Sequence, residues 1–364
     1  MLSSSNIFQL SSYTESKSKR VSILNSSRNS TMKTEESSLT DAWLLRMLLS
    51  WYRSCPRFAR IGGLDFSFTI ASSLFLSVIR VITFQVLVHL GWPARSKMTT
   101  DASSSLTSIL HAIALCSWLT VFFAKLGWRN YIPSCKMNSH ANEDFQDVAT
   151  ACLQFCTGYM LFDSVWLIKD TYQLGLMPLT EFELLVLAHH FMTSFYMTSC
   201  RLIQAGHLSA MILMLTGEIS NPLMNGMFTT RFAIQLECCS SENMMVLHSL
   251  LEHIFAIVYL VFRIFIGPAC AIHLSWDILF TKEGRKNIPF PLSLIWVAMV
   301  VLVIVGSGPF VLEAIEMLRD GWELKFPPSY DFGERFRIQD GELWYQMKIE
   351  KMLAWLQALE KSLG

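Results

Sequence analysis

The hydrophobic residues of this chain gather into long runs that short polar segments separate. Seven runs approach the roughly 20 residues that a helix needs to cross a bilayer. They lie at about 66–90, 104–125, 148–168, 182–200, 205–223, 245–266 and 291–315. The fifth run is the weakest, because Asn221 and Pro222 interrupt its end. This pattern predicts an all-α, multi-pass transmembrane helix bundle of about seven spans.

Polar or mixed segments flank these runs and divide the chain. Residues 1–40 are rich in Ser, Asn and Lys and are expected to form a disordered tail. Residues 41–60 carry Trp and Leu at helical spacing among arginines, which predicts an interfacial amphipathic helix. Residues 61–103 hold the first span and its loop, 104–320 the main helical domain, and 321–364 a C-terminal tail with an amphipathic helix. The stretch 226–238 is too short to span and is expected to be interfacial or re-entrant.

The composition agrees with a membrane protein. The chain has 364 residues, of which 52% are hydrophobic and 16% charged, whereas a soluble domain carries about 25% charged residues. The net charge is zero and no domain is basic, so nucleic-acid binding is not expected. Cys152 and Cys156 lie one turn apart, but no second pair has zinc-type spacing, so neither a metal site nor a resident cofactor is predicted. Basic residues beside the runs slightly favour a cytoplasmic N-terminus.

Two adjacent histidines, His189 and His190, lie inside the fourth run. Ionisable groups at membrane depth cost several kcal/mol unless they face a protein interior or water. Neighbours on a helix point about 100° apart, so one ring can face an interior chamber while the other bonds to a neighbouring helix. The alternative is that neighbouring helices satisfy both imidazoles, which then have a packing role only. The pair, with an acid nearby in the sequence, favours a polar, lipid-accessible chamber inside the bundle.

Carboxylates and amides in neighbouring runs are expected to approach these histidines. Asp163 in the third run needs a partner, and His189, His190 or Arg263 are candidates. A second group lies at the end of the fifth run and shares one helix face, where Pro222 frees backbone carbonyls. The alternative for this group is a capped, kinked helix end. Its members are Glu218, Asn221 and Asn225.

Further polar residues are candidates for binding a substrate. Tyr259 and Arg263 are one turn apart in the sixth run, so both are expected to face inward near the mouth of the chamber. The alternative makes Arg263 a structural partner of a nearby acid. Arg201 follows His190 on nearly the same stripe of the fourth helix, and His111 lies on a polar face of the second.

The order of these short motifs resembles the TLC-domain family, which includes ceramide synthases and translocon-associated membrane proteins. The resemblance covers roughly 104–320 and implies a compact helix bundle, in the endoplasmic reticulum or a related endomembrane, that acts on or senses lipids. Ceramide synthases carry a His-Asp-x-x-Asp element where this chain has Glu218 to Asn221, so the chain looks nearer to the smaller lipid-homeostasis group. The matching segments are Ser108 to His111, Gly158 to Asp163, His189-His190, Glu218 to Pro222 with Asn225, and Phe262-Arg263.

Two functions are carried forward from these residues. In the first, the protein is a lipid acyltransferase in which His189 or His190 is general base or nucleophile, oriented by Asp163 or Glu218. Acyl-CoA is then the candidate co-substrate, and membrane lipids are the expected partners. In the second, the same residues form a lipid-binding or packing network of a non-catalytic regulator or trafficking factor. The expected substrate-binding residues are His111, Arg201, Asn221, Asn225, Tyr259 and Arg263.

Overall fold

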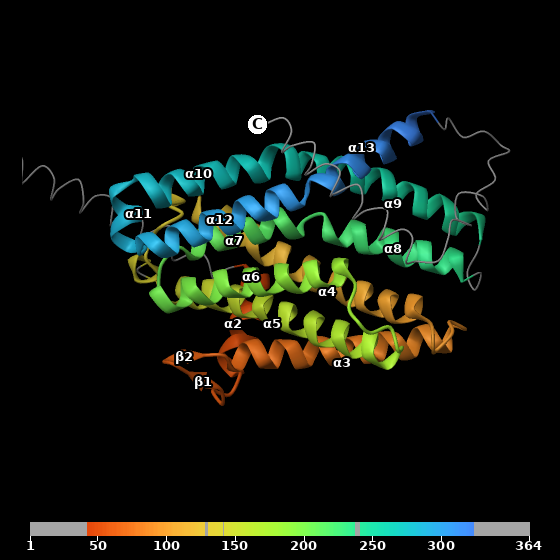
Figure 1. Cartoon of the computed structure of the whole chain (residues 1–364). Helices are drawn as coiled ribbons and strands as arrows, with labels where there is room; N and C mark the ends of the chain where they lie inside the picture. Colours follow the sequence, from red (N-terminus) through yellow and green to blue (C-terminus); the bar gives the residue numbers. More distant parts are fainter. Residues whose placement is uncertain (1–41, 128–129, 141, 237–240, 324–364) are drawn as a thin grey trace, which may run out of the picture.

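The computed structural model describes residues 42–127, 130–140, 142–236 and 241–323 (Figure 1). Within these ranges the named elements are helices and one short hairpin, in which β1 (Arg60–Ile61) pairs antiparallel with β2 (Leu64–Asp65). The expected disordered tail over 1–40 and nearly all of the expected C-terminal amphipathic helix lie outside the described residues. The all-α class is confirmed.

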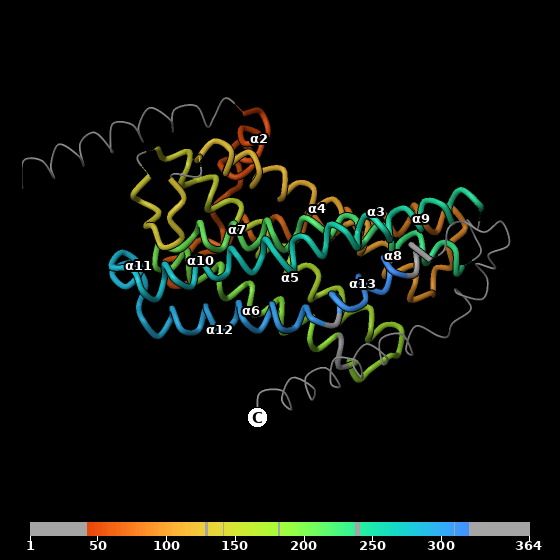
Figure 2. Tube along the Cα trace, turned by 90° about the horizontal axis from the view of Figure 1, so that it is seen from above, coloured from red at the N-terminus to blue at the C-terminus, as the bar shows by residue number. Residues whose placement is uncertain are grey.

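Long helical rods run lengthwise through the molecule in both views (Figures 1 and 2). Consecutive rods run back and forth between the same two ends, so the bundle has an end near α11 and an opposite end near the start of α9. Three short helices lie at the α11 end: α2 (Trp43–Ser54), the 3₁₀ turn η3 (Met137–Ser139) and α11 (Lys282–Asn287). The rods are α3 (Ser67–His89), α4 (Lys97–Leu126), α5 (Glu143–Gln173), α6 (Glu181–Ile203), α7 (His207–Glu218) with α8 (Asn221–Gln235), α9 (Glu242–Leu260) with η4 (Val261–Ile266) and α10 (Gly267–Phe280), and α12 (Phe290–Gly306) with α13 (Gly308–Glu323).

Five of these rods are long and apolar enough to cross a membrane: α3, α4, α5, the continuous rod from α9 to α10, and the rod from α12 into α13. The chain is therefore an integral, multi-pass membrane protein. Neither α6 nor the broken rod α7–α8 is among the five. With 12 residues, α7 extends about 18 Å, which is less than the ~30 Å hydrocarbon core. The expected count of seven spans stays a prediction.

The break between α7 and α8 lies where the sequence predicted it. Pro222 occupies the first turn of α8, where its missing N–H is not needed, and Ile219 and Ser220 join the two helices. The stretch 226–238 belongs to α8 as far as Gln235, and α8 packs against α4 and α9. Its expected interfacial or re-entrant position stays a prediction.

Small residues let α3 and α5 approach closely. A Cβ placed on Gly158 of α5 would lie 2.6 Å from the carbonyl oxygen of Thr69 and 2.9 Å from the Cβ of Ser72, so only glycine fits there. The buried Gln154 side chain accepts a hydrogen bond from the Thr69 backbone N–H at 3.3 Å. Packing at this seam fixes the rotation of α5, which carries several of the polar residues discussed below.

The helix α2 packs its apolar face on the bundle. Leu45, Leu48 and Leu49 are buried against α4 and α5, whereas Trp43 and Met47 on the other face are exposed. Its last turn is tied to α5, because Arg53 Nε donates to Asp147 Oδ2 at 2.9 Å. A helix thus begins at Trp43 within the expected segment 41–60, and its position at a membrane interface stays a prediction.

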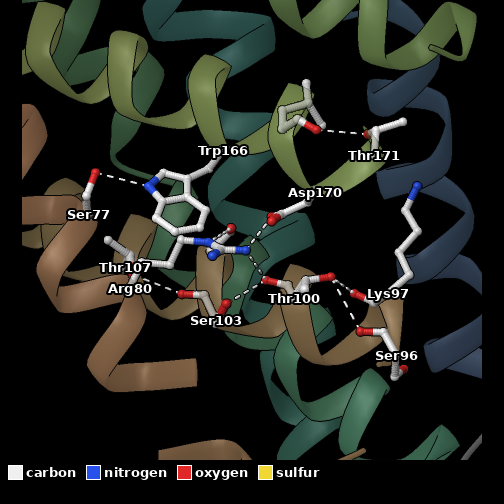
Figure 3. Close-up of polar contacts among 12 residues, drawn as sticks. Ser77, Arg80, Ser96, Lys97, Thr100, Ser103, Thr107, Trp166, Asp170 and Thr171 are labelled. Carbon is white, nitrogen blue, oxygen red and sulfur yellow. Dashed lines mark hydrogen bonds and ion pairs between the residues drawn. The ribbon is translucent and has the colours of Figure 1, made fainter. Parts of the chain in front are cut away.

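A charged cluster holds α3, α4 and α5 together near the opposite end (Figure 3). The guanidinium of Arg80 on α3 forms an ion pair with Asp170 on α5, and its Nε donates to Ser104 Oγ on α4 at 2.9 Å. The same guanidinium lies 4.0 Å above the ring of Trp166, whose indole N–H donates to Ser77 Oγ at 3.0 Å. Arg80 is therefore buried within the bundle and has Asp170 as its counter-charge.

Candidate functional site

The two histidines of α6 lie in different surroundings. His190 is 7% exposed and faces α5, whereas His189 is half-buried. The Nδ1 atom of His190 lies 3.1 Å from Ser164 Oγ, and its Nε2 atom lies 3.6 Å from Asp163 Oδ2. The second distance exceeds an N–H···O hydrogen bond but is close enough for a charge interaction. The centroids of the two rings are 5.9 Å apart.

A stack of rings connects α4 with α5 beside this pair. The imidazole of His111 is fully buried and lies parallel to the ring of Tyr159, with centroids 3.9 Å apart. The Tyr159 hydroxyl forms a 2.8 Å hydrogen bond with Ser108 Oγ, one turn before His111. The Tyr159 ring is 6.4 Å from the His190 ring, so it lies near both histidines and links them. Neither nitrogen of His111 has a hydrogen-bond partner among the described residues.

An acid and an amide meet where α7 passes into α8. The Glu218 side chain is buried and accepts a 2.7 Å hydrogen bond from Asn221 Nδ2. Its Oε2 atom lies 3.9 Å from His111 Nδ1, too far for a hydrogen bond. Asn225 lies one turn further along α8, and its Nδ2 donates to the Asn221 carbonyl at 2.9 Å. Glu218 and Asn221 therefore belong to the His111 neighbourhood.

Arg263 lies on a π-helical segment, η4. Gly267 N–H donates to the Phe262 carbonyl five residues back, and a Cβ on Gly267 would lie 2.7 Å from that oxygen. Pro268 follows and has no N–H to donate, so the Gly-Pro pair favours the wider turn. Such π-turns are frequent at functional sites.

The π-turn directs Arg263 toward the end of α7. Its Nη2 donates to the Gly217 carbonyl at 3.3 Å, and its guanidinium lies 5.4 Å from the centroid of the buried Tyr259 ring. Its Nε atom is buried and has no hydrogen-bond partner among the described residues. Arg263 thus ties η4 to the end of α7, next to Glu218.

Arg201 lies elsewhere. It follows His190 by about 16 Å along α6, at the end of the bundle that carries the β1–β2 hairpin. Its guanidinium donates to the backbone carbonyl of Asp65 and lies 5.3 Å from the centroid of the Phe66 ring. The spacing places Arg201 and His190 on nearly the same stripe of α6, but the two residues lie far apart along the length of that helix. We therefore omit Arg201 from the candidate site.

The hairpin that holds Arg201 is itself electrostatically stabilised. Arg57 Nη1 lies 2.8 Å from Asp65 Oδ2, and the Ser67 N–H donates to Asp65 Oδ1 at 2.9 Å. Burial raises the pKa of the Asp65 carboxyl, but the Ser67 hydrogen bonds and the Arg57 charge outweigh burial, so the pKa lies below its ordinary value.

The structure thus joins most of the expected site residues in one contiguous polar region. His190 belongs to it with Asp163 and the neighbouring His189. His111 and Glu218 join through Tyr159, and Arg263 joins at Gly217, the residue before Glu218. Sequence reasoning did not select Ser164 as a partner of His190. The available signal was its position directly after Asp163 in an apolar run. The region comprises His111, Tyr159, Asp163, Ser164, His189, His190, Glu218, Asn221, Tyr259 and Arg263, and we call it the His190 cluster.

A bundle of long apolar rods with a buried set of histidines, acids and an arginine defines an integral membrane protein with a polar interior. The sequence model of the TLC domain matches residues 101–307. The chain therefore belongs to the TLC-domain family, as the motif order indicated, and this family indicates a function related to membrane lipids. The matched range contains every residue of the His190 cluster. No curated protein and no solved structure matches the chain.

Proposed function

We propose that this protein is a lipid acyltransferase of the endoplasmic reticulum or a related endomembrane, with acyl-CoA as donor and His190 as the catalytic base. The observation that carries the proposal is the environment of His190: a buried imidazole with Ser164 at one nitrogen and Asp163 near the other. Imidazole suits this chemistry because its pKa in water lies near neutrality. The apolar rods around the cluster offer surroundings in which a lipid acceptor and an acyl chain are soluble.

Hydrogen bonding to Ser164 assigns the two ring nitrogens different tasks. When Nδ1–H donates to Ser164 Oγ, Nε2 holds the free lone pair and can take the proton from an acceptor hydroxyl or amine. The acceptor atom then attacks the thioester carbonyl, the C–S bond breaks, and the CoA thiolate leaves and takes the proton from Nε2. Asp163, 3.6 Å from Nε2, stabilises the imidazolium between these two proton transfers.

Arg263 and Glu218 are proposed to bind and orient the substrate. A guanidinium forms bidentate contacts with phosphate oxygens, which CoA and phospholipid head groups both provide. Arg263 has a buried Nε without a partner among the described residues, so it retains a donor for such a ligand. Glu218 and Asn221 lie at the α7–α8 junction. Their side-chain oxygens can accept a hydrogen bond from the hydroxyl or amine that receives the acyl group.

The proposal is tested by acyl transfer with purified full-length protein in lipid nanodiscs, using radiolabelled acyl-CoA and a mixed lipid acceptor pool. His190→Ala should lower labelled lipid product by about 100-fold or more, and Asp163→Asn should lower it by about 10- to 100-fold. The matched control is His273→Ala, which removes an exposed histidine from α10. Equal product from wild type and His190→Ala at matched protein levels would refute the assigned base.

A non-catalytic lipid regulator is the second candidate, favoured by one observation. The Tyr159 hydroxyl, the Glu218 carboxylate and the Arg263 guanidinium each bond to another group of the bundle. Residues that satisfy one another in this way can serve packing alone. This candidate predicts binding of a photoactivatable lipid that His190→Ala leaves unchanged, together with no labelled product from the wild-type protein.

A further inference from the structure

A second cluster of reactive side chains lies at the end of the bundle that carries α2 and α11. Cys135 and His140 come from the segment between α4 and α5, and His207 is the first residue of α7. Their exposed fractions are 9%, 1% and 0%. The cluster is about 20 Å along α6 from His190, measured from His190 to the end of that helix. It is therefore separate from the His190 cluster.

The three side chains direct their ligand atoms toward one point. The Nε2 atoms of His140 and His207 are 3.1 Å apart, and Cys135 Sγ lies 3.7 Å from the first and 3.8 Å from the second. A tetrahedral zinc ion with bonds of ~2.05 Å to nitrogen and ~2.3 Å to sulfur separates its ligands by about 3.3 Å (N to N) and about 3.6 Å (S to N). The observed triangle agrees with both values within about 0.3 Å.

Backbone hydrogen bonds hold the two contributing loops in place. Met137 N–H donates to the Gln204 carbonyl at 2.7 Å, and Gly206 N–H donates to the Cys135 carbonyl at 3.1 Å. Lys136 and Ala205 form an isolated antiparallel bridge between them. The ligand-bearing residues are thus fixed by pairing of the loops and do not depend on the cluster alone for their position.

The residue before His207 is restricted by its surroundings. Gly206 has φ +76°, a conformation that L side chains rarely adopt, and a Cβ there would lie 2.7 Å from the Trp296 ring. This turn places His207 at the beginning of α7, with its ring directed at the α4–α5 segment. The geometry of the triangle is therefore built by the fold on both sides.

We propose that Cys135, His140 and His207 bind one Zn²⁺ ion. A thiolate and two neutral imidazoles are a preferred ligand set of Zn²⁺, and the oxygen-seeking ions Mg²⁺ and Ca²⁺ do not favour it. Binding releases the thiol proton to solvent and forms the Zn–S bond. Three protein ligands leave a fourth tetrahedral position, which water or a substrate occupies in zinc sites with three protein ligands.

In this proposal the ion cross-links two segments of the chain. It joins the α4–α5 segment to the start of α7, two parts of the chain that are 67 residues apart at His140 and His207. The cross-link stabilises the end of the bundle from which α7 extends to Glu218 of the His190 cluster. The zinc site does not rest on the acyl-transfer proposal, since its readouts are metal content and stability.

The test begins with full-length protein purified in detergent from zinc-supplemented cells. Metal analysis by mass spectrometry should find about one zinc per chain. His207→Asn, which lacks an atom at the Nε2 position, and Cys135→Ser should each lose most of it. Cys200→Ser is the matched control, because Cys200 is a buried thiol in the same region whose Sγ donates to the Gly206 carbonyl and is not part of the triangle.

Two measurements on the wild-type protein keep the proposal testable if the variants fold poorly. Removal of zinc by a chelator should lower the thermal midpoint, and added Zn²⁺ should restore it. Replacement by Co²⁺ should produce the thiolate-to-cobalt charge-transfer absorption, which the His207→Asn protein lacks. Zinc-free wild-type protein that takes up neither ion, or zinc content unchanged in both ligand variants, would overturn the proposal in favour of a hydrogen-bonded thiol–imidazole network.

Discussion

Two buried polar regions of the same bundle differ in how completely they are bonded. Around Arg80, every contact named above is an ion pair, a ring contact or a hydrogen bond of ordinary length. In the His190 cluster, key pairs remain at 3.6 and 3.9 Å, and both nitrogens of His111 and the Nε of Arg263 have no partner among the described residues. Buried polar groups are normally satisfied. The Arg80 region is therefore built for packing, whereas the His190 cluster retains donors and acceptors for a ligand.

The largest effect is expected from Arg80. Arg80→Ala removes a buried guanidinium and leaves the half-buried Asp170 carboxylate without this partner. Breaking a fully buried pair costs about 3–5 kcal/mol, which is the upper bound for this one. We expect a strongly lowered thermal midpoint and low yield in detergent, with unchanged acyl transfer per folded molecule. The exposed Arg46 on α2 supplies the control variant Arg46→Ala. Loss of transfer by a well-folded Arg80→Ala protein would remove the distinction between the two regions.

A smaller effect is expected from Arg263. Arg263→Lys keeps the charge but loses the planar fork, so lipid or CoA binding should weaken by about 10-fold, and Arg263→Ala should weaken it further. Thermal stability should change little, because the hydrogen bond that is lost, from Arg263 to the Gly217 carbonyl, is long at 3.3 Å and therefore weak. Binding of fluorescent acyl-CoA and the thermal midpoint are measured on the same preparations. Unchanged binding by a folded Arg263→Ala protein would assign Arg263 to packing, like Arg80.

The smallest effect is expected at the hairpin, a third polar region that is bonded but half-exposed. Asp65 has a folded-state pKa below its unfolded value, so its contribution to stability is present above about pH 4 and is lost as the pH falls through the folded pKa. Because the Arg57–Asp65 pair is screened by solvent, this contribution is below about 1 kcal/mol. Thermal midpoints of wild type and Asp65→Asn should differ slightly at pH 7 and converge as the pH falls through the folded-state pKa of Asp65. A difference that grows on acidification would contradict this sign.

Local signals in the sequence predicted much of the fold. The runs of apolar residues located the rods, since the bilayer requires length and apolarity of each one separately. Pro222 located the break between α7 and α8 for an equally local reason, its missing N–H. The number of spans stays a prediction, because α6 and α7–α8 are not among the five rods that are long and apolar enough to cross a membrane.

The site was predicted in part. The cost of burying charge identified His190, Asp163, Glu218 and Arg263 as interior residues, and helix periodicity paired Arg263 with Tyr259. Periodicity alone placed Arg201 with His190, although the two lie at different depths. Ser164 was missed because a serine in an apolar run is inexpensive to bury and therefore gives no signal of its own.

The sequence by itself determined that this protein is a helical membrane bundle of the TLC-domain family with a polar interior, because apolar length, burial cost and motif order are properties of single segments. Only the tertiary structure decided that His190 and not His189 faces α5, that Arg80 pairs with Asp170 across 90 residues, and that Cys135 and His140 meet His207. Each of these contacts depends on how one helix is rotated and shifted against another. That rotation follows from the fit of side chains across many seams, such as the one at Gly158, and no single segment encodes it.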